Sequence, residues 1–184
     1  MKNILILANN DIGLYKFRKE LIEELVKEYK VYISLPYGEF IPDLISLGCE
    51  YIETPISRRG TNPITDFKLF LKYIKSIKKV KPFVVLTYTI KPNIYGGLAC
   101  TLTKIPYISN ITGLGSSIEN GGFLQKFTLF LYKTAMKKAS CVFFQNKENQ
   151  AFFTGKNIVK VKNMLIPGSG VNTNYYDLMD SPLD

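Results

Sequence analysis

Hydrophobic and polar positions along the chain switch repeatedly between a strand pattern and a helix pattern. Apolar runs bounded by turn residues predict strands at residues 3–8, 31–35, 51–52, 83–86, 107–111 and 141–144, with edge structure at 159–161 and 164–166. Apolar residues at helical spacing, together with helix-ending glycine and proline, predict helices over residues 15–28, 40–47, 64–80, 93–103, 123–138 and 147–153.

This alternation of strand and helix predicts an α/β fold, a Rossmann-like, doubly wound parallel sheet with right-handed crossovers. The continuous apolar run at 83–86 is typical of a parallel strand covered on both faces. Gly96 and Gly97 belong to a helix of small residues, which we expect to approach the sheet closely. Residues 1–171 contain no internal linker and are expected to form one domain. The polar residues 172–184 are expected to begin a linker to a further domain.

Two of the predicted helices are amphipathic and basic. In the helix over 64–80, one face is expected to be apolar, with Phe67, Phe70, Leu71, Ile74 and Ile77, and the other to carry lysines. The helix over 123–138 combines apolar, mostly aromatic residues with lysines. The apolar residues are Phe123, Leu124, Phe127, Phe130 and Leu131, and the lysines are Lys126, Lys133, Lys137 and Lys138. Such a helix either packs within the domain or lies on an anionic lipid surface.

The composition is that of an ordinary globular domain with a basic charge. The 184 residues are 46% hydrophobic and 21% charged, and the formal net charge is +9. This charge favours nucleic acid, acidic lipid or phosphorylated small molecules as partners, unless the lysines are simply solvated on helix surfaces. No helix-turn-helix, RNP or zinc-finger pattern supports nucleic acid, which is not expected. The sequence contains no run of about 18 apolar residues, so no transmembrane helix is expected.

Cysteine and histidine content excludes several kinds of site. The three cysteines, Cys49, Cys100 and Cys141, are far apart in sequence, and the chain contains no histidine. Zinc and haem sites of the usual kinds are therefore not expected. A Ser-His-Asp or Cys-His nucleophile is excluded because its base is missing. The odd number of isolated cysteines predicts buried thiols in a reducing compartment.

Candidate binding residues lie at the ends of the predicted strands, where parallel sheets bind ligands. The runs at 83–86 and 107–111 lead into polar, glycine-rich turns. These turns contain residues that a core does not require, namely Lys91, Asn93, Asn110, Thr112, Gly113 and Gly115. Backbone amides of the glycine-rich loop could cradle a ligand, although such a connection can also be a simple turn.

The turn after the first strand and the loop after the third hold further candidates. Residues 9–13 lack the GxGxxG pattern, and the chain lacks GxxxxGK[ST], which disfavours an NAD or FAD enzyme and excludes a P-loop. Asp11 is either a site residue or the cap of the following helix. Arg58, Arg59 and Lys91 either bind a phosphate or carboxylate or are solvated.

Together these motifs resemble the N-terminal half of a GT-B glycosyltransferase of the large retaining family 4, in particular the bacterial transferases of capsule, O-antigen and lipopolysaccharide assembly. The matching segments cover nearly the whole chain: Asn10-Asp11 with Phe17-Arg18, Arg58-Arg59-Gly60 with Asn62-Pro63, Lys81-Pro82, and residues 91–96, 110–115 and 167–172.

The resemblance implies two Rossmann-like domains with the site between them. This half would hold the acceptor, and the other would bind a nucleotide sugar, expected to be a UDP-sugar, as substrate. No cofactor or metal is implied. Asp11 and Asn110 are expected to be catalytic, and the expected acceptor-binding residues are Asn10, Gly13, Arg59, Lys91, Asn93, Thr112 and Gly113. Alone, this half is expected to be inactive.

Many relatives carry a histidine that contacts the donor sugar, and here that contact is absent or replaced by Asn110 or Thr112. The resemblance implies that the leaving phosphate helps to deprotonate the acceptor, so that no strong protein base is required. The whole hexosyltransferase is expected to extend a lipid-linked glycan as a peripheral protein on the cytoplasmic face of the membrane. Two alternatives are a non-catalytic, membrane-recruiting acceptor subunit of a split glycosyltransferase, and a sugar-nucleotide epimerase, against which the lack of histidine argues.

Overall fold

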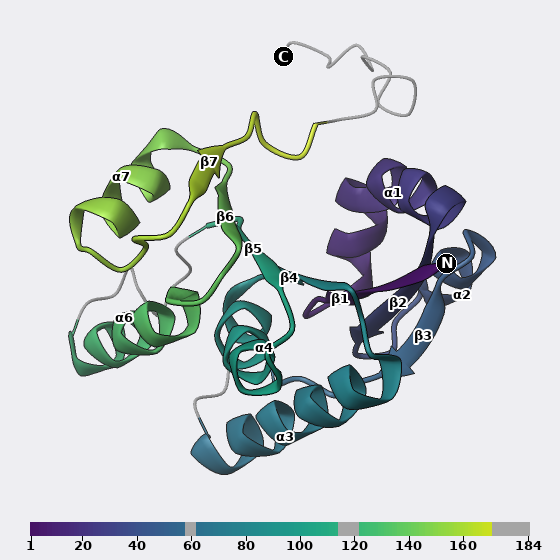
Figure 1. The fold of residues 1–184 in the computed structure, drawn as a ribbon, viewed down its shortest axis with the longest axis horizontal. Coiled ribbons are helices and arrows are strands. Elements are labelled where there is room, and N and C mark those ends of the chain that lie inside the picture. Colours follow the sequence, from purple (N-terminus) through teal and green to yellow (C-terminus); the bar gives the residue numbers. More distant parts are fainter. Residues whose placement is uncertain (58–61, 114–121, 171–184) are drawn as a thin grey trace, which may run out of the picture.

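The chain forms one seven-stranded sheet in the order β3-β2-β1-β4-β5-β6-β7, with every neighbouring pair parallel (Figure 1). The computed structural model describes residues 1–57, 62–113 and 122–170. The strands are β1 (Lys2–Leu7), β2 (Tyr29–Leu35), β3 (Glu50–Glu53), β4 (Val84–Tyr88), β5 (Tyr107–Ile111), β6 (Cys141–Phe144) and β7 (Asn163–Leu165). The predicted α/β fold with a doubly wound parallel sheet is therefore confirmed.

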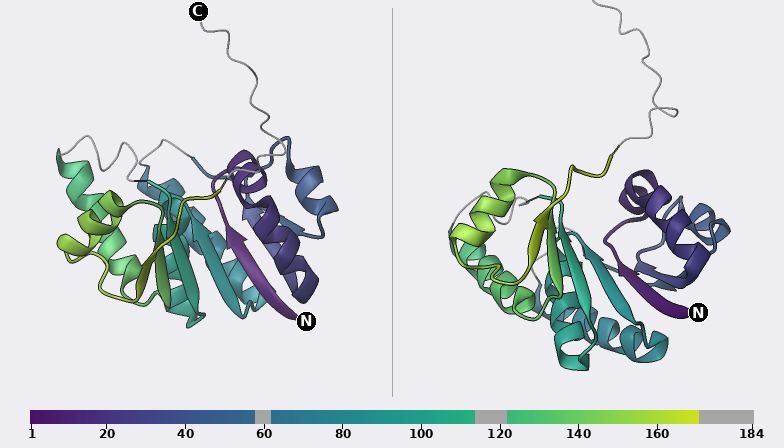
Figure 2. Two further views of the ribbon diagram at one scale, coloured as in Figure 1. Left: turned by 90° about the horizontal axis from the view of Figure 1, so that it is seen from above. Right: turned by 45° about the horizontal axis from the view of Figure 1, so that its top comes forward.

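Helices cover both faces of this sheet. They are α1 (Asp11–Glu28), α2 (Ile41–Ser46), α3 (Pro63–Val80), the π-helical turn η1 (Pro92–Gly96), α4 (Gly97–Thr103), α6 (Gly122–Met136) and α7 (Lys147–Gly155). One core cluster joins α1 and α2 to the sheet, and a second cluster joins α3, α4, α6 and α7 to its other face (Figures 1 and 2). The chain order reverses between β1 and β4, which is the switch point where such sheets bind ligands.

Asparagine side chains begin three of the helices. Oδ1 of Asn10 accepts a hydrogen bond from Gly13 N at 2.6 Å, and Oδ1 of Asn62 accepts one from Ile64 N at 2.9 Å. Asn146 caps α7 in the same way. These bonds satisfy backbone N–H groups that a first helical turn leaves without a partner. Of the two alternatives for Asp11, that of the helix cap is wrong, because Asn10 has that position.

One predicted edge segment is absent. Residues 159–161 form no strand, because the backbone N–H groups of Ile158 and Val159 both donate to Phe153 O and close the end of α7. The ladder to β6 begins only where Val142 N donates to Lys162 O. The predicted edge segment at 164–166 is confirmed in part by β7.

The amphipathic face of α3 differs from the prediction. Its buried residues are Asp66, Leu69, Tyr73, Ser76, Ile77 and Val80, whereas Phe67 is 58% and Leu71 48% exposed. The helix contains more large apolar residues than one face can hold. Leu69, Tyr73, Ile77 and Val80 recur at spacings of three and four, so packing them on the sheet turns Phe67 and Leu71 outward.

The aromatic residues of α6 lie mostly outside the core. Phe123 is 85% exposed, Phe127 48% and Phe130 62%, while the core contacts come from Thr128, Tyr132, Ala135 and Met136. The rings of Phe123 and Phe127 are stacked, with centroids 6.3 Å apart. Packing among the described residues therefore does not account for this aromatic face.

Gly96 brings η1 against the sheet, as predicted. A Cβ atom at Gly96 would lie 2.6 Å from Leu7 Cδ1 and 3.3 Å from Thr87 Cγ2, and the Leu7 side chain is fully buried. At Gly97, a Cβ atom would lie 3.2 Å from Ala135 O of α6. The two glycines therefore allow a close approach to β1 on one side and to α6 on the other.

We expect Gly96→Ala to lower the free energy of unfolding by about 1–3 kcal/mol, because the added methyl overpacks a site with no free volume. Urea unfolding would measure the change. Gly155→Ala is the matched control, since a Cβ atom at Gly155 would meet no packed neighbour within 4 Å among the described residues. The control should be neutral or stabilising by up to about 1 kcal/mol. Equal stability of the two variants would contradict the close approach.

Candidate functional site

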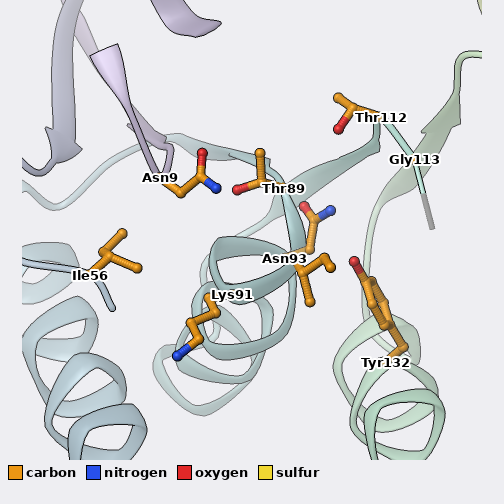
Figure 3. Close-up of a pocket in the computed structure, with 9 residues that line it drawn as sticks. Asn9, Ile56, Thr89, Lys91, Asn93, Thr112, Gly113 and Tyr132 are labelled. Carbon is orange, nitrogen blue, oxygen red and sulfur yellow. The ribbon is translucent and has the colours of Figure 1, made fainter. Parts of the chain in front are cut away.

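Three adjoining cavities lie along the carboxyl ends of β1, β4 and β5. The first, of about 220 Å³, is lined by residues that follow these strands, including Asn9, Thr89, Lys91, Asn93, Thr112 and Gly113 (Figure 3). The second, of about 380 Å³, shares Asn9, Thr89 and Thr112 with the first and extends to the start of α1. The third, of about 360 Å³, continues along α1 and shares Arg18 and Tyr88 with the second. The second and third cavities have the size of small-molecule sites, and the first is smaller.

A buried hydrogen-bond network forms the floor of the first cavity. Thr87 Oγ1 donates to Asn93 Oδ1 at 2.7 Å, and Asn93 Nδ2 donates to Asn110 O at 3.0 Å. Thr87 and Ser109 also share a hydrogen bond of 2.9 Å between their hydroxyls. The Asn93 side chain is fully buried. It therefore links the ends of β4 and β5. The predicted contact of Asn93 with the acceptor substrate remains a prediction.

Thr89 is a residue of this site that the sequence analysis missed. Its φ of +71° is uncommon for a β-branched residue, and its carbonyl accepts a hydrogen bond from Asn93 N at 2.9 Å. Within the described residues, its buried Oγ1 has no hydrogen-bond partner. Strained backbone and an unsatisfied hydroxyl beside a cavity are typical of functional sites. No local sequence signal could have found it, because glycine or asparagine is expected at such a backbone conformation.

Asn110 also has an unsatisfied group. The residue is 6% exposed, and its buried Oδ1 has no partner in the described part of the chain. It lines the third cavity and pairs with Tyr88 across the β4–β5 ladder, whereas Thr112 and Gly113 line the first. A buried oxygen without a donor is available to a ligand hydroxyl or amide.

Asp11 holds the chain rather than lining a cavity. Its side chain is buried, and Oδ2 accepts a hydrogen bond from Phe40 N at 2.8 Å. Gly38 packs so closely that a Cβ atom there would lie 2.3 Å from the carboxylate. Asp11 is absent from the lining of all three cavities, so its contacts support a role in fixing the loop before α2.

Lys91 is paired with an acid that the sequence analysis also missed. Its Nζ lies 2.5 Å from Oδ1 of Asp66, and the two side chains are only 14% and 13% exposed. Tyr95 donates a hydrogen bond of 2.8 Å to Oδ2 of the same carboxylate. Burial, and then the bond to Asp66, raise the pKa of Tyr95. The Lys91 side chain extends away from Asn9 and Thr89 (Figure 3). A ligand in the first cavity would have to share this lysine with Asp66.

The remaining predicted site residues either line the second cavity or lie outside the described residues. Asn10 and Gly13 line the second cavity, and Arg59 lies outside the described residues, as do Arg58, Gly60 and Gly115. All three cysteines are buried and free, which confirms the predicted buried thiols. Burial raises the pKa of Cys49 to about 11 and that of Cys100 to about 12. Within the described ranges, no group of three His, Cys, Asp or Glu side chains is arranged to hold a metal ion.

The sequence matches a known family. The family model described as "Glycosyl transferase 4-like" matches residues 3–146, so the chain belongs to this family of glycosyltransferases. A curated relative from Campylobacter jejuni, named N,N'-diacetylbacillosaminyl-diphospho-undecaprenol alpha-1,3-N-acetylgalactosaminyltransferase, is 29% identical over 172 residues. That alignment covers 90% of this chain and 46% of the relative.

Solved structures agree on the fold. HepE from Anabaena, solved in complex with UDP and glucose, superposes with a TM-score of 0.67 at 16% identity, over 96% of this chain and 46% of that protein. A UDP-N-acetylglucosamine 2-epimerase superposes with a TM-score of 0.65 at 12% identity, over 89% of this chain and 47% of that protein. These likenesses show the GT-B half-fold alone. The chain spans about half the length of each of these three proteins.

We expect Asp11→Ala to lower the free energy of unfolding by about 1–3 kcal/mol, because it leaves the Phe40 N–H, in a partly buried position, without its acceptor. Chemical denaturation would measure the loss. Glu39→Ala removes an exposed carboxylate beside Phe40 and should change stability by no more than about 0.5 kcal/mol. If Asp11→Ala proved as stable as the unaltered chain, the role assigned to its carboxylate would be wrong.

Proposed function

We propose that this chain is the acceptor-binding half of a retaining glycosyltransferase that transfers a sugar from a nucleotide sugar to a lipid-linked glycan. One observation carries the proposal. Adjoining cavities at the switch point combine apolar side chains with polar groups that are mostly neutral amides and hydroxyls, among them the unsatisfied oxygens of Thr89 and Asn110. Sugar hydroxyls are both donors and acceptors, so they match such a lining. The name of the Campylobacter relative, with its diphospho-undecaprenol acceptor, supports the lipid-linked class.

The proposed chemistry does not require a strong base from this half. In a retaining transfer on one face of the sugar, the leaving phosphate of the nucleotide accepts the acceptor proton. No acidic side chain among the described residues lines the second cavity, and the lysine of the first cavity is paired with Asp66. The residues of this half would therefore orient the acceptor hydroxyl and exclude water. A UDP-sugar is the proposed donor, and its binding groups would lie mainly in the other half.

We also propose that the protein is peripheral on the inner face of the cytoplasmic membrane. The aromatic face of α6, together with Ile64 and Phe67 at the start of α3, is exposed beside lysines such as Lys126 and Lys68. Both helices follow strands, so they begin at the carboxyl edge where the cavities lie. Exposed aromatic and basic residues together suit an anionic lipid surface. Among the described residues, no helix has the length and apolar character to cross a bilayer.

The function is tested by sugar transfer in a protein that joins this chain to the remaining half of the transferase. Labelled UDP-sugars would be offered with a polyprenyl-diphosphate-linked saccharide. We expect transfer, and we expect Asn110→Ala to lower kcat/KM about tenfold or more, since it removes a buried hydrogen-bonding group from the acceptor site. Asn163→Ala, in the edge strand β7, should leave kcat/KM unchanged.

Two results would contradict this assignment. Undiminished transfer by the Asn110→Ala variant would remove Asn110 from the site. Consumption of a UDP-sugar without any glycan product, as in epimerisation, would overturn the function itself. If transfer instead required a separate donor-binding chain, the chain would be the acceptor subunit of a split glycosyltransferase.

Membrane contact is tested by flotation with vesicles that contain anionic phospholipid. We expect Phe123→Ser with Phe127→Ser to reduce the vesicle-bound fraction, with the partition coefficient falling at least about tenfold, because two large apolar side chains no longer enter the lipid. Phe83→Ser is the matched control. Phe83 is 53% exposed but precedes β4, at the amino edge of the sheet. Equal loss in both variants would contradict a lipid contact specific to α6.

A further inference from the structure

Arg18 is a buried cation at the junction of two of the cavities. It lies in the middle of α1, is only 9% exposed, and lines both the second and the third cavity. Its Nη1 donates a hydrogen bond of 2.6 Å to Phe17 O, and its guanidinium carbon lies 5.0 Å from the centroid of the Tyr88 ring. The side chain is thus held in position by its own helix and by the end of β4.

No carboxylate neutralises this charge in the described part of the chain. The ion pairs there involve Lys19, Lys27, Lys30 and Lys91, and none involves Arg18. Among the described residues, the only carboxylate that lines either cavity is Glu20, which is exposed.

Tyr88 does not supply the missing negative charge. Burial raises the pKa of the Tyr88 hydroxyl, and the nearby Arg18 opposes this rise without abolishing it. The phenol is therefore neutral at physiological pH. It gives the guanidinium a cation–π contact but no counter-ion.

A buried guanidinium without a counter-ion is unfavourable for the folded chain. Arginine keeps its proton in proteins, so it cannot escape the cost of burial by becoming neutral. The desolvation free energy of a buried charge is offset only by a well-placed opposite charge. An anion that enters the junction would therefore gain a strong, directional partner.

The surroundings favour a phosphoryl oxyanion in this place. The guanidinium fork presents paired donors that match two oxygens of a phosphate. Asn10 and Gly13, in the first turn of α1, line the same second cavity, so the positive end of the helix dipole adds to the attraction. The unsatisfied Thr89 hydroxyl lies on this cavity as well and can bond an ester or sugar oxygen.

We propose that Arg18 binds a phosphoryl group of the glycosyl ligand where the second and third cavities join. The inference deepens the proposed function and rests on it for the identity of the ligand. Two ligands of that reaction carry the required group, namely the lipid-linked acceptor and the nucleotide sugar. The chemistry they share is a diphosphate ester.

Binding of inorganic pyrophosphate to the 184-residue chain tests the assignment by calorimetry, without any transfer reaction. We expect Arg18→Met to weaken binding about tenfold or more, as is usual for the loss of a charge-assisted bidentate contact. Arg18→Lys should weaken it less, because the charge remains and the fork is lost. Lys27→Met removes a charge from the exposed end of the same helix and should change affinity less than about twofold.

Thermal unfolding separates a binding role from a structural one. We expect the Tm of Arg18→Met to equal or exceed that of the unaltered chain, because the variant removes a buried, unneutralised charge. Arg18→Lys stays informative if the methionine variant fails to fold. Unchanged pyrophosphate affinity in the Arg18 variants that fold, or no pyrophosphate binding by the unaltered chain at millimolar concentration, would overturn the inference.

Competition identifies the source of the phosphate. Displacement of pyrophosphate by a short isoprenyl diphosphate, but not by UDP, would assign the group to the acceptor, and the reverse would assign it to the donor. Either result supports the role of Arg18. Arg18-dependent binding in a protein that transfers no sugar would leave this inference standing while the proposed function fails. Sugar transfer that is unaffected by the Arg18 variants would leave the proposed function standing while this inference fails.

Discussion

The fully buried side chain of Asn93 is the contact on which the site depends. It accepts from Thr87 at the end of β4 and donates to the carbonyl of Asn110 in β5. At these carboxyl ends the ladder stops and the chain leaves the sheet, so this side-chain link continues the connection between the two strands. Because the link is buried and satisfied on both sides, it fixes the spacing of the two loops that carry Thr89 and Thr112. Without a fixed floor, the cavities above it would not have a defined shape.

Charge divides the polar residues at this edge into two groups. Asp11 and Lys91 each have partners within the chain, namely Phe40 N and Asp66. Arg18 has only its own helix carbonyl and a neutral phenol. Buried charges are stable when paired, so a paired group serves the fold first, and an unpaired one is free to meet a ligand. The same logic applies to the neutral oxygens of Thr89 and Asn110, which have no partner within the described residues.

The family assignment and the site carry different kinds of information. The match to residues 3–146 establishes that the chain belongs to the glycosyl transferase 4-like family. The half-fold itself is shared with an epimerase at a TM-score of 0.65, so fold alone does not choose a reaction. In this chain, most polar groups that line the cavities are neutral amides and hydroxyls, and a buried cation, Arg18, lies where two of the cavities join. These features support the proposed recognition of a ligand that carries both sugar and phosphate.

The sequence by itself determined the order of strands and helices and most of their positions. Periodicity is a local property, and the apolar runs of β1, β4 and β5 had no other stable placement than a covered parallel sheet. It also located the carboxyl-edge loops and the close approach at Gly96. Local pattern did not determine which face of α3 is buried, since Phe67 and Leu71 match helical spacing as well as Leu69 and Tyr73.

Only the tertiary structure decided which polar residues are available to a ligand. Asp66 and Lys91 are 25 residues apart, and Asp11 and Phe40 are 29 apart, so their pairing depends on how α3 and α2 pack on the sheet. The positive φ of Thr89 and the lack of an ion pair to Arg18 within the described ranges are likewise products of packing. The residue type determines which hydrogen bonds and ion pairs a side chain can form. Whether that capacity is already satisfied depends on neighbours that the chain brings together only on folding.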